Sequence, residues 1–286
     1  MIGSFLFQEG GIKMAKVITI CNHKGGVAKT TTTLNLGVGL AREDRSVLLI
    51  DADSQGNLTS ALGCRNGDDT LDKTIANFIP AIIKGIDYSV QDTILHHEEG
   101  VDLLPANCEL ADWEVGLGGV MNRERIISNI VSKVKDSYDY ILIDSPPSLG
   151  IMSINTISAA DSVVIPTTPG DFSVNGLTKM LRTINNIKKY INHSIYVEGV
   201  LITRADFRTT LPRETKEVLN DIFGNYVNIF DVIIPEAISA NKAVRTGKSI
   251  FEFNGNSSVA KTYGELSKQI ISREERTIGE IEREVI

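Results

Sequence analysis

One glycine-rich segment constrains the fold of this chain more than any other feature. It covers residues 21–31 with the sequence CNHKGGVAKTT, between an apolar run at residues 17–20 and a helix-compatible segment at residues 31–41. A strand, a glycine-rich turn and a helix in this order form a loop that holds phosphates, because backbone N–H groups point inward and the helix N-terminus adds partial positive charge. The sequence therefore predicts a phosphate-binding loop in which Lys29 reaches the β- and γ-phosphates and the Thr30 hydroxyl ligates Mg²⁺.

The loop departs from the ordinary G-x-x-x-x-G-K-T form, because His23 and Ala28 occupy its two glycine positions. The early lysine, Lys24, directly before the paired glycines resembles the deviant Walker A motif of the ParA/MinD/NifH group of ATPases. This resemblance implies that Lys24 crosses a nucleotide-sandwich dimer to the partner's ATP, and it makes Lys24 and Lys29 catalytic residues. The nucleotide-binding residues it implies in the loop are Lys24, Gly25, Gly26, Val27, Ala28, Lys29, Thr30 and Thr31. The alternative is a chance Gly-Gly turn with a solvated lysine.

The rest of the chain alternates apolar runs with helix-compatible segments. Strands are expected at residues 46–51, 101–105, 138–144, 162–166, 197–202 and 228–234, and helices include residues 174–190 and 211–223. Continuous apolar runs are typical of strands buried on both faces. We therefore expect an α/β fold with a mostly parallel twisted sheet and helices on both faces, which the loop specifies as a P-loop NTPase of the deviant Walker A type.

The expected organisation is one P-loop ATPase domain over residues 14–272. An N-terminal extension precedes it at residues 1–13, with Met14 as an alternative start, and a charged tail follows at residues 273–286. Residues 64–98 are the least patterned and are expected to form a peripheral insertion. No apolar run approaches the roughly 18 residues that span a bilayer. The three cysteines form no disulfide framework, which indicates reduced thiols in the cytoplasm.

A first pair of carboxylates follows the apolar run that ends at residue 51. Side chains that leave the C-terminal ends of parallel strands lie in the crevice where such sheets bind ligands. The segment DADSQGN at residues 51–57 resembles the family's D-x-D-P-Q-G-N, with Ser54 in place of proline. The resemblance implies that Asp53 is catalytic and orients the attacking water, and that Asp51 supports the Mg²⁺ shell. A polar turn at the end of the strand is the alternative.

The second carboxylate motif contains Asp144, which ends the apolar run at residues 141–143 in the Walker B pattern. Phosphoryl-transfer sites need such a group to hold Mg²⁺, here through its water shell. The continuation Asp144-Ser145-Pro146-Pro147 resembles the family's D-x-P-P loop, which senses the γ-phosphate. The metal-site prediction is therefore Thr30, Asp51 and Asp144.

The C-terminal half extends the resemblance to ParA proteins over most of residues 15–272. Arg204 lies in a segment, residues 203–206, where the family contacts adenine. Pro235 lies in residues 234–237, which resemble the later adenine loop. Gly247-Lys248-Ser249 imitates a phosphate loop but lacks an upstream glycine and a preceding strand, so we reject it as a second nucleotide site.

The net charge of −7 argues against a generally basic surface, although local clusters remain. Residues 241–248 carry three cations and no acid, and in ParA proteins this region contributes to DNA binding. The predicted DNA-binding residues are Lys242, Arg245 and Lys248. A second group, diluted by acids, contains Arg204, Arg208, Arg213 and Lys216. No helix-turn-helix signature is evident, so contacts to phosphates without sequence preference are expected, and solvated surface charge is the alternative.

Together these features resemble a ParA-type partitioning ATPase without an N-terminal helix-turn-helix domain. The resemblance implies a slow, Mg²⁺-dependent ATP hydrolase whose ATP-bound homodimer binds double-stranded DNA non-specifically. It further implies a ParB-like partner on the cargo DNA of a plasmid, chromosome or mobile element, and a cytoplasmic, nucleoid-associated location away from membranes. One alternative is a MinD-like membrane-associated ATPase, although the tail at residues 272–286 has five Glu against three Arg. A NifH-like reductase would need paired cysteines for an iron–sulfur cluster, and Cys64 and Cys108 do not match that arrangement.

Overall fold

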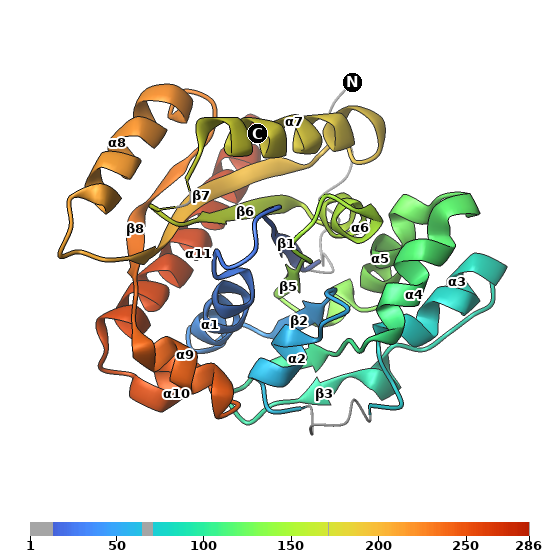
Figure 1. The fold of residues 1–286 in the computed structure, drawn as a ribbon. Helices are drawn as coiled ribbons and strands as arrows, with labels where there is room; N and C mark the ends of the chain where they lie inside the picture. Colours follow the sequence, from blue (N-terminus) through green and yellow to red (C-terminus); the bar gives the residue numbers. More distant parts are fainter. Residues whose placement is uncertain (1–13, 65–70, 171, 286) are drawn as a thin grey trace.

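An eight-stranded sheet forms the centre of the fold (Figure 1). The computed structural model describes residues 14–64, 71–170 and 172–285, so the predicted extension at residues 1–13 lies outside the described residues. The strand order is β3-β4-β2-β5-β1-β6-β7-β8. The strands are β1 (Lys16–Ile20), β2 (Val47–Asp51), β3 (Leu95–His96), β4 (Asp102–Leu104), β5 (Tyr140–Asp144), β6 (Ser162–Thr167), β7 (Tyr196–Ala205) and β8 (Ile229–Pro235).

Neighbouring strands pair in parallel throughout, except for the antiparallel pair of β3 and β4 at one edge. Parallel strands need crossover connections, which helices supply here. The helices are α1 (Lys29–Ala41), α2 (Asn57–Ala61), α3 (Ile79–Lys84), α4 (Glu109–Gly116), α5 (Ile126–Ser132), α6 (Ile151–Ala159), α7 (Val174–Tyr190), α8 (Leu211–Phe223), α9 (Ile238–Arg245), α10 (Ile250–Asn254) and α11 (Ser258–Val285).

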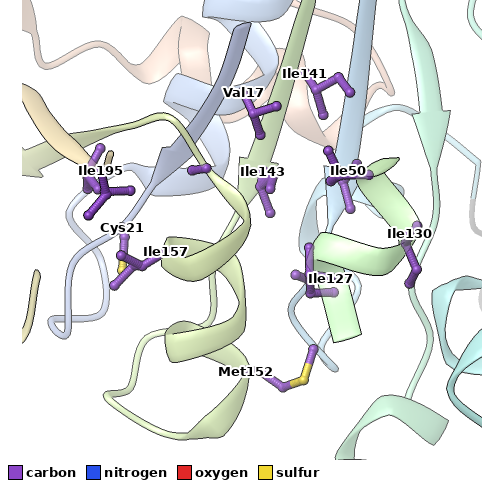
Figure 2. Packing of buried hydrophobic residues seen from close by; sticks show 14 of the residues in the cluster. Val17, Cys21, Ile50, Ile127, Ile130, Ile141, Ile143, Met152, Ile157 and Ile195 are labelled. Atoms are coloured by element: carbon purple, nitrogen blue, oxygen red, sulfur yellow. The ribbon is translucent and has the colours of Figure 1, made fainter. Parts of the chain in front are cut away.

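The sheet buries both of its faces. Successive strand residues point to opposite sides, so Val17 joins one hydrophobic cluster and Ile18 joins the other. The first cluster packs the sheet against α5, α6 and α7; Figure 2 shows strand residues of this cluster facing Ile127 of α5 and Ile157 of α6. The second cluster packs the sheet against α1, α10 and α11. This double coverage explains why the strands read as continuous apolar runs.

The predicted fold class is confirmed, and the differences are local. The bounds predicted for α7 and α8 coincide with those observed, whereas α1 begins at Lys29, two residues before the predicted helix. Within the poorly patterned stretch, residues 71–98 contain α3 and the two-residue strand β3. Helix α11 runs without interruption through residue 272, the expected end of the ATPase domain. The division into domain and tail stays a prediction.

Strand order sets the position of the site. β1 lies between β5 and β6. The chain passes from β1 to β2 on one side of β1, but from β5 to β6 on the other side, so the direction of winding reverses at this point. Open α/β sheets bind ligands at such a switch point, outside the C-terminal ends of the strands. Asp51 at the end of β2 lies opposite Asp144 at the end of β5, and Ile20 of β1 pairs with Asp144 on the other side. The two predicted acidic motifs therefore meet beside the start of the phosphate loop.

Helices α1 and α11 approach each other closely at Gly39. A Cβ atom at Gly39 would overlap with the Oγ atom of Ser267 on α11 and would lie 3.4 Å from Phe251 Cζ. Ser267 Cβ is also 3.4 Å from that position, which is tight but tolerable. Glycine is thus needed at position 39 of α1 because any larger side chain would collide with the hydroxyl of Ser267.

We predict that Gly39→Ala destabilises the protein, and that Ser267→Ala in the same chain reverses much of the loss. An exposed Gly→Ala change in a helix gains about 1 kcal/mol, but forcing an extra atom into a packed contact costs about 1–3 kcal/mol. Urea unfolding of both single variants and the double variant measures the coupling. A Gly39→Ala protein more stable than the unmodified chain would contradict this packing argument.

Candidate nucleotide-binding site

The phosphate loop connects β1 to α1, and its backbone takes left-handed conformations at two points. Gly26 has a φ of 73° and Ala28 a φ of 60°, with Ala28 directly before the first residue of α1. Asn22 anchors the start of the loop, because its Nδ2 donates to the Pro166 carbonyl at 2.7 Å and its Oδ1 accepts from the Lys24 amide at 3.1 Å. These conformations turn the loop backbone around the space in front of α1.

Lys29 is the buried cation of the site. Only 7% of it is exposed, and its Nζ donates to the Lys24 carbonyl at 3.0 Å. Burial lowers the pKa of Lys29, and the carboxylates of Asp144 and Asp53 act in the opposite direction. A partly desolvated ammonium at the entrance of a helix needs anionic partners, and phosphate oxygens supply them.

Thr30 and Asp144 form the candidate magnesium position. Thr30 Oγ1 donates to Asp144 Oδ2 at 2.6 Å, and Thr33 Oγ1 donates to Oδ1 of the same carboxylate at 3.3 Å. Burial is the largest cause that raises the pKa of Asp144, followed by the neighbouring Asp51 charge. A hydroxyl beside a crowded, buried carboxylate provides the hard oxygen ligands that Mg²⁺ prefers, and the ion's charge would stabilise the carboxylate form. The residues present therefore fit Mg²⁺.

Asp51 and Asp53 differ in what their carboxylates contact. Asp51 is fully buried and accepts from the Thr59 amide at 2.8 Å, the Thr59 hydroxyl at 2.7 Å and the Asp53 amide at 3.2 Å. Burial raises the pKa of Asp51 to about 6. Asp53 is 5% exposed, lines the cavity described below and accepts from the Gln55 amide at 3.0 Å. Asp51 thus holds its own loop together, while Asp53 faces the cavity.

A cavity of about 470 Å³ opens at the phosphate loop, a size common for cofactor sites. One end carries the loop backbone and the polar residues Lys29, Thr30 and Asp53, and the other end is mainly apolar. Polar groups suit phosphates, and an apolar slot suits a planar base. The apolar end is formed by Ile234, Pro235, Ala237, Ala240, Val259 and Tyr263.

Arg204 bridges the two ends of the cavity. Its Nη1 donates to the Gly26 carbonyl at 2.9 Å, and its Nη2 pairs with Glu236 Oε1 at 3.0 Å. Its own backbone has a φ of 52°, a left-handed conformation that is uncommon for a residue with a side chain. One guanidinium thus connects the phosphate loop to the segment that follows β8.

The structure brings most of the predicted nucleotide residues to this one cavity. The predicted residues that line it are Gly25, Gly26, Ala28, Lys29, Thr30, Thr31, Asp53, Arg204 and Pro235. Val27 is buried instead, and its carbonyl accepts from Thr203 Oγ1 at 3.1 Å. Lys24 is partly exposed and lines a separate small cavity beside α7. Asp51 and Asp144 lie behind the cavity lining.

The sequence motifs did not indicate several lining residues. Tyr263 and Val259 come from α11, more than 220 residues after the phosphate loop, and belong to no local pattern. The Tyr263 hydroxyl lies 3.2 Å from Thr32 Oγ1 of α1, which places α11 directly behind the loop. The apolar spacing of α11 predicts a buried face but not which residue of that face reaches the ligand. Asn57, Pro147, Ile234, Glu236 and Ala237 lie within the predicted motif segments but were not named as site residues, and Ala240 lies outside those segments.

The predicted DNA-binding residues lie outside the cavity, on and after α9. Lys242 and Arg245 are exposed, whereas Lys248 pairs with Glu252 at 3.2 Å. The N-terminal half of α9 contributes Ala240 to the cavity. A single short helix therefore connects the nucleotide cavity to these two exposed cations.

Known relatives match this chain over nearly its whole length. A family model described as an AAA domain matches residues 15–197. The sporulation initiation inhibitor protein Soj of Bacillus subtilis is 37% identical over 257 residues, which cover 90% of this chain and 98% of that protein. The chromosome-partitioning ATPase Soj of Treponema pallidum is 34% identical over 261 residues, covering 91% of this chain and 99% of that protein.

Solved structures agree. Cobyrinic acid a,c-diamide synthase from Mycobacterium smegmatis, with bound ADP and magnesium, superimposes with a TM-score of 0.77 at 30% identity and covers 90% of this chain and 94% of that one. The cell division ATPase MinD of Pyrococcus furiosus gives 0.71 at 25% identity, covering 91% and 99%. With its phosphate loop, its two acidic motifs and these relatives, the chain belongs to the ParA/Soj family of P-loop ATPases.

Proposed function

We propose that this protein is a ParA-type ATPase that binds ATP with Mg²⁺, closes into a sandwich dimer and moves DNA with a ParB-like partner. The observation that carries the proposal is that two lysines of one loop lie in different cavities. Lys29 lines the nucleotide cavity, whereas Lys24 lies outside that cavity on the same loop. Because Lys24 lies outside the cavity of its own nucleotide, the proposal assigns it to the nucleotide of a second protomer.

Each residue of the cavity has a distinct task in this proposal. The loop amides and Lys29 would bind the phosphates, and Thr30 and Asp144 would hold Mg²⁺, which would neutralise developing charge on the phosphoryl group. Asp53, which faces the cavity, orients the attacking water. The apolar end, with Pro235 and Arg204 at its rim, receives the adenine base. Asp51 supports the metal shell indirectly, by holding the loop that carries Asp53.

DNA binding is proposed for the exposed face of α9. Lys242 and Arg245 are exposed, and a dimer would carry two such pairs, which increases the number of phosphates that one complex contacts. Lys248 contributes less than the sequence indicates, because its charge is already paired with Glu252. Hydrolysis stimulated by the ParB-like partner would return the protein to monomers and release the DNA.

The MinD-like alternative rests on the structural likeness to MinD of Pyrococcus furiosus. Among the helices that the structure describes, none is both long and apolar enough to cross a membrane. Residues 272–286 carry five Glu against three Arg, a composition that anionic lipid repels. Co-sedimentation with DNA and with liposomes, each with and without ATP, distinguishes the two functions; liposome binding without DNA binding would favour the alternative.

The two lysines are expected to separate nucleotide binding from dimerisation. Lys29→Ala removes a charge-assisted bond to phosphate, and such bonds contribute about 1.5–3 kcal/mol, so ATP affinity is expected to fall about 10- to 100-fold. Lys24→Ala is expected to bind ATP but to remain monomeric. Titration with a fluorescent ATP analogue and light scattering measure these properties. ATP-dependent dimers of Lys24→Ala would remove the cross-subunit role.

Asp53 is expected to act on hydrolysis and not on binding. Asp53→Ala should form an ATP dimer that does not turn over, with hydrolysis reduced about 100-fold or more, the range for loss of a positioned acid or base. Phosphate release and light scattering give the two readouts. Asp51→Asn is a poor substitute, because it disturbs the bonds to Thr59. Full activity of Asp53→Ala would exclude Asp53 from the mechanism.

DNA affinity of the ATP-bound protein should depend on salt through Lys242 and Arg245. Each neutralised phosphate contributes about −0.9 to the slope of log affinity against log salt, so the double Gln variant should have a slope shallower by about 1.8 per protomer. Lys248→Gln is the matched control and should change the slope less, because Glu252 already pairs with that lysine. Equal effects of all three lysine and arginine changes would contradict the role of the ion pair.

A further inference from the structure

The solvent face of α7 carries a row of cations from its second turn to its C-terminal end. Helix α7 buries Leu177, Met180, Ile184 and Ile187 against the sheet. On the opposite side it exposes three cations, Lys179, Arg182 and Lys189, which we name the α7 stripe. Their separations of three and seven residues keep them on one side of the helix, over about 15 Å of its length. The exposed neutral residues among them, Asn175, Thr178, Asn185 and Asn186, add hydrogen-bonding groups.

The α7 stripe differs from other cations on the surface in its ion pairing. Arg208, Arg213 and Lys216, which the sequence placed in a basic group, each pair with a carboxylate at 2.8–3.4 Å. Within the described part of the chain, no carboxylate forms an ion pair with a residue of the stripe. Residues 172–197 contain four cations and no Asp or Glu, although the whole chain has a net charge of −7. Helix α7 itself thus contains cations and no acid.

Helix stability accounts for only part of this charge. Lys188 and Lys189 lie in the last turn of α7, where the helix dipole favours cations. Lys179 and Arg182 lie well before that turn, where the dipole gives them no such benefit. Three like charges on one helix face also repel each other slightly. A polyanionic ligand removes this repulsion and uses all three charges.

We propose that the α7 stripe binds the phosphate backbone of a nucleic acid, without sequence preference. Regularly spaced phosphates match a row of cations separated by amide and hydroxyl side chains, which also donate to phosphate oxygens. A lipid surface fits less well, because the residues exposed between Lys179 and Lys189 are polar, and the exposed bulky side chains of α7, Val174 and Tyr190, lie only at its two ends. Figure 1 shows α7 well apart from α9, on the other side of the sheet.

The stripe goes beyond the proposed function because it is complete within one protomer. The α9 contacts are expected to matter when ATP joins two protomers, whereas the α7 stripe needs neither ATP nor a dimer. Its effect can therefore be measured in the nucleotide-free protein. This separates a failure of the inference from a failure of the proposed ATP-dependent dimer.

The experiment measures binding of the full chain, without nucleotide, to a labelled duplex of arbitrary sequence over a series of salt concentrations. The variant carries Lys179→Gln, Arg182→Gln and Lys189→Gln, and its salt slope should be shallower by about 2.7, or 0.9 for each lost phosphate contact. The matched control carries Lys133→Gln, Arg213→Gln and Lys268→Gln, three cations that are ion-paired in the structure. It has the same net charge as the α7 variant and should keep the slope of the unmodified protein. ATP binding by both variants checks folding.

Four results decide the inference. A shallower slope for the α7 variant alone supports it, even if ATP then adds no DNA binding and the proposed function fails. Equal slopes for the two triple variants overturn it, because net charge and not position would then be the cause. ATP-dependent DNA binding that needs Lys242 and Arg245 but not the stripe overturns it while the proposed function stands. Stripe-dependent binding to phosphatidylglycerol vesicles, with none to the duplex, overturns the nucleic acid as the ligand.

Discussion

Three carboxylates lie close together where β2 and β5 end, and the arrangement of the site follows from the need to keep them buried. Asp51 and Asp144 are paired in register at the ends of the neighbouring strands β2 and β5, and neither is exposed. Asp53 follows Asp51 by two residues. Buried like charges raise each other's pKa and favour protonation unless cations or hydrogen bonds compensate. Here hydroxyl groups of Thr30 and Thr59 donate to them, and Lys29 supplies one positive charge. One ammonium group does not balance the charge of three carboxylates, and a divalent cation would supply the missing positive charge.

Two residues of the same cavity have strained backbone conformations. Ala28 and Arg204 both have positive φ, and both line it. An L-residue in this region costs roughly 1–2 kcal/mol, which packing elsewhere must offset. At Ala28 the strain directs the loop into the first turn of α1, where Lys29 begins the helix. Alanine at this glycine position of the motif therefore carries a conformational cost that glycine would not.

Local patterns predicted the parts of the site that are local. The phosphate loop, the two acidic strand ends and the bounds of α7 and α8 depend on neighbouring residues, so the sequence alone indicated them. Tyr263 reaches the cavity through packing between α1 and α11, whose contacting residues are 231 positions apart, and no spacing rule reports such a contact. The sequence indicated that nearby acids dilute the charge of Arg208, but only the structure shows that Arg208 donates two hydrogen bonds to the Asp206 carboxylate.

The segment with Lys242 and Arg245 is attached at both ends to elements that form the nucleotide site. At one end Ala240 lines the cavity; at the other, the Ile250 amide donates to Asn35 of α1 at 2.8 Å. Between them Gly247 lies against Gly63, just after α2, so closely that a Cβ on Gly247 would be 2.9 Å from the Gly63 Cα. Helix α2 in turn starts directly after the Asp53 loop. Because close-packed backbones cannot shift independently, a rearrangement of the Asp53 loop that displaces α2 also displaces the exposed cations of α9.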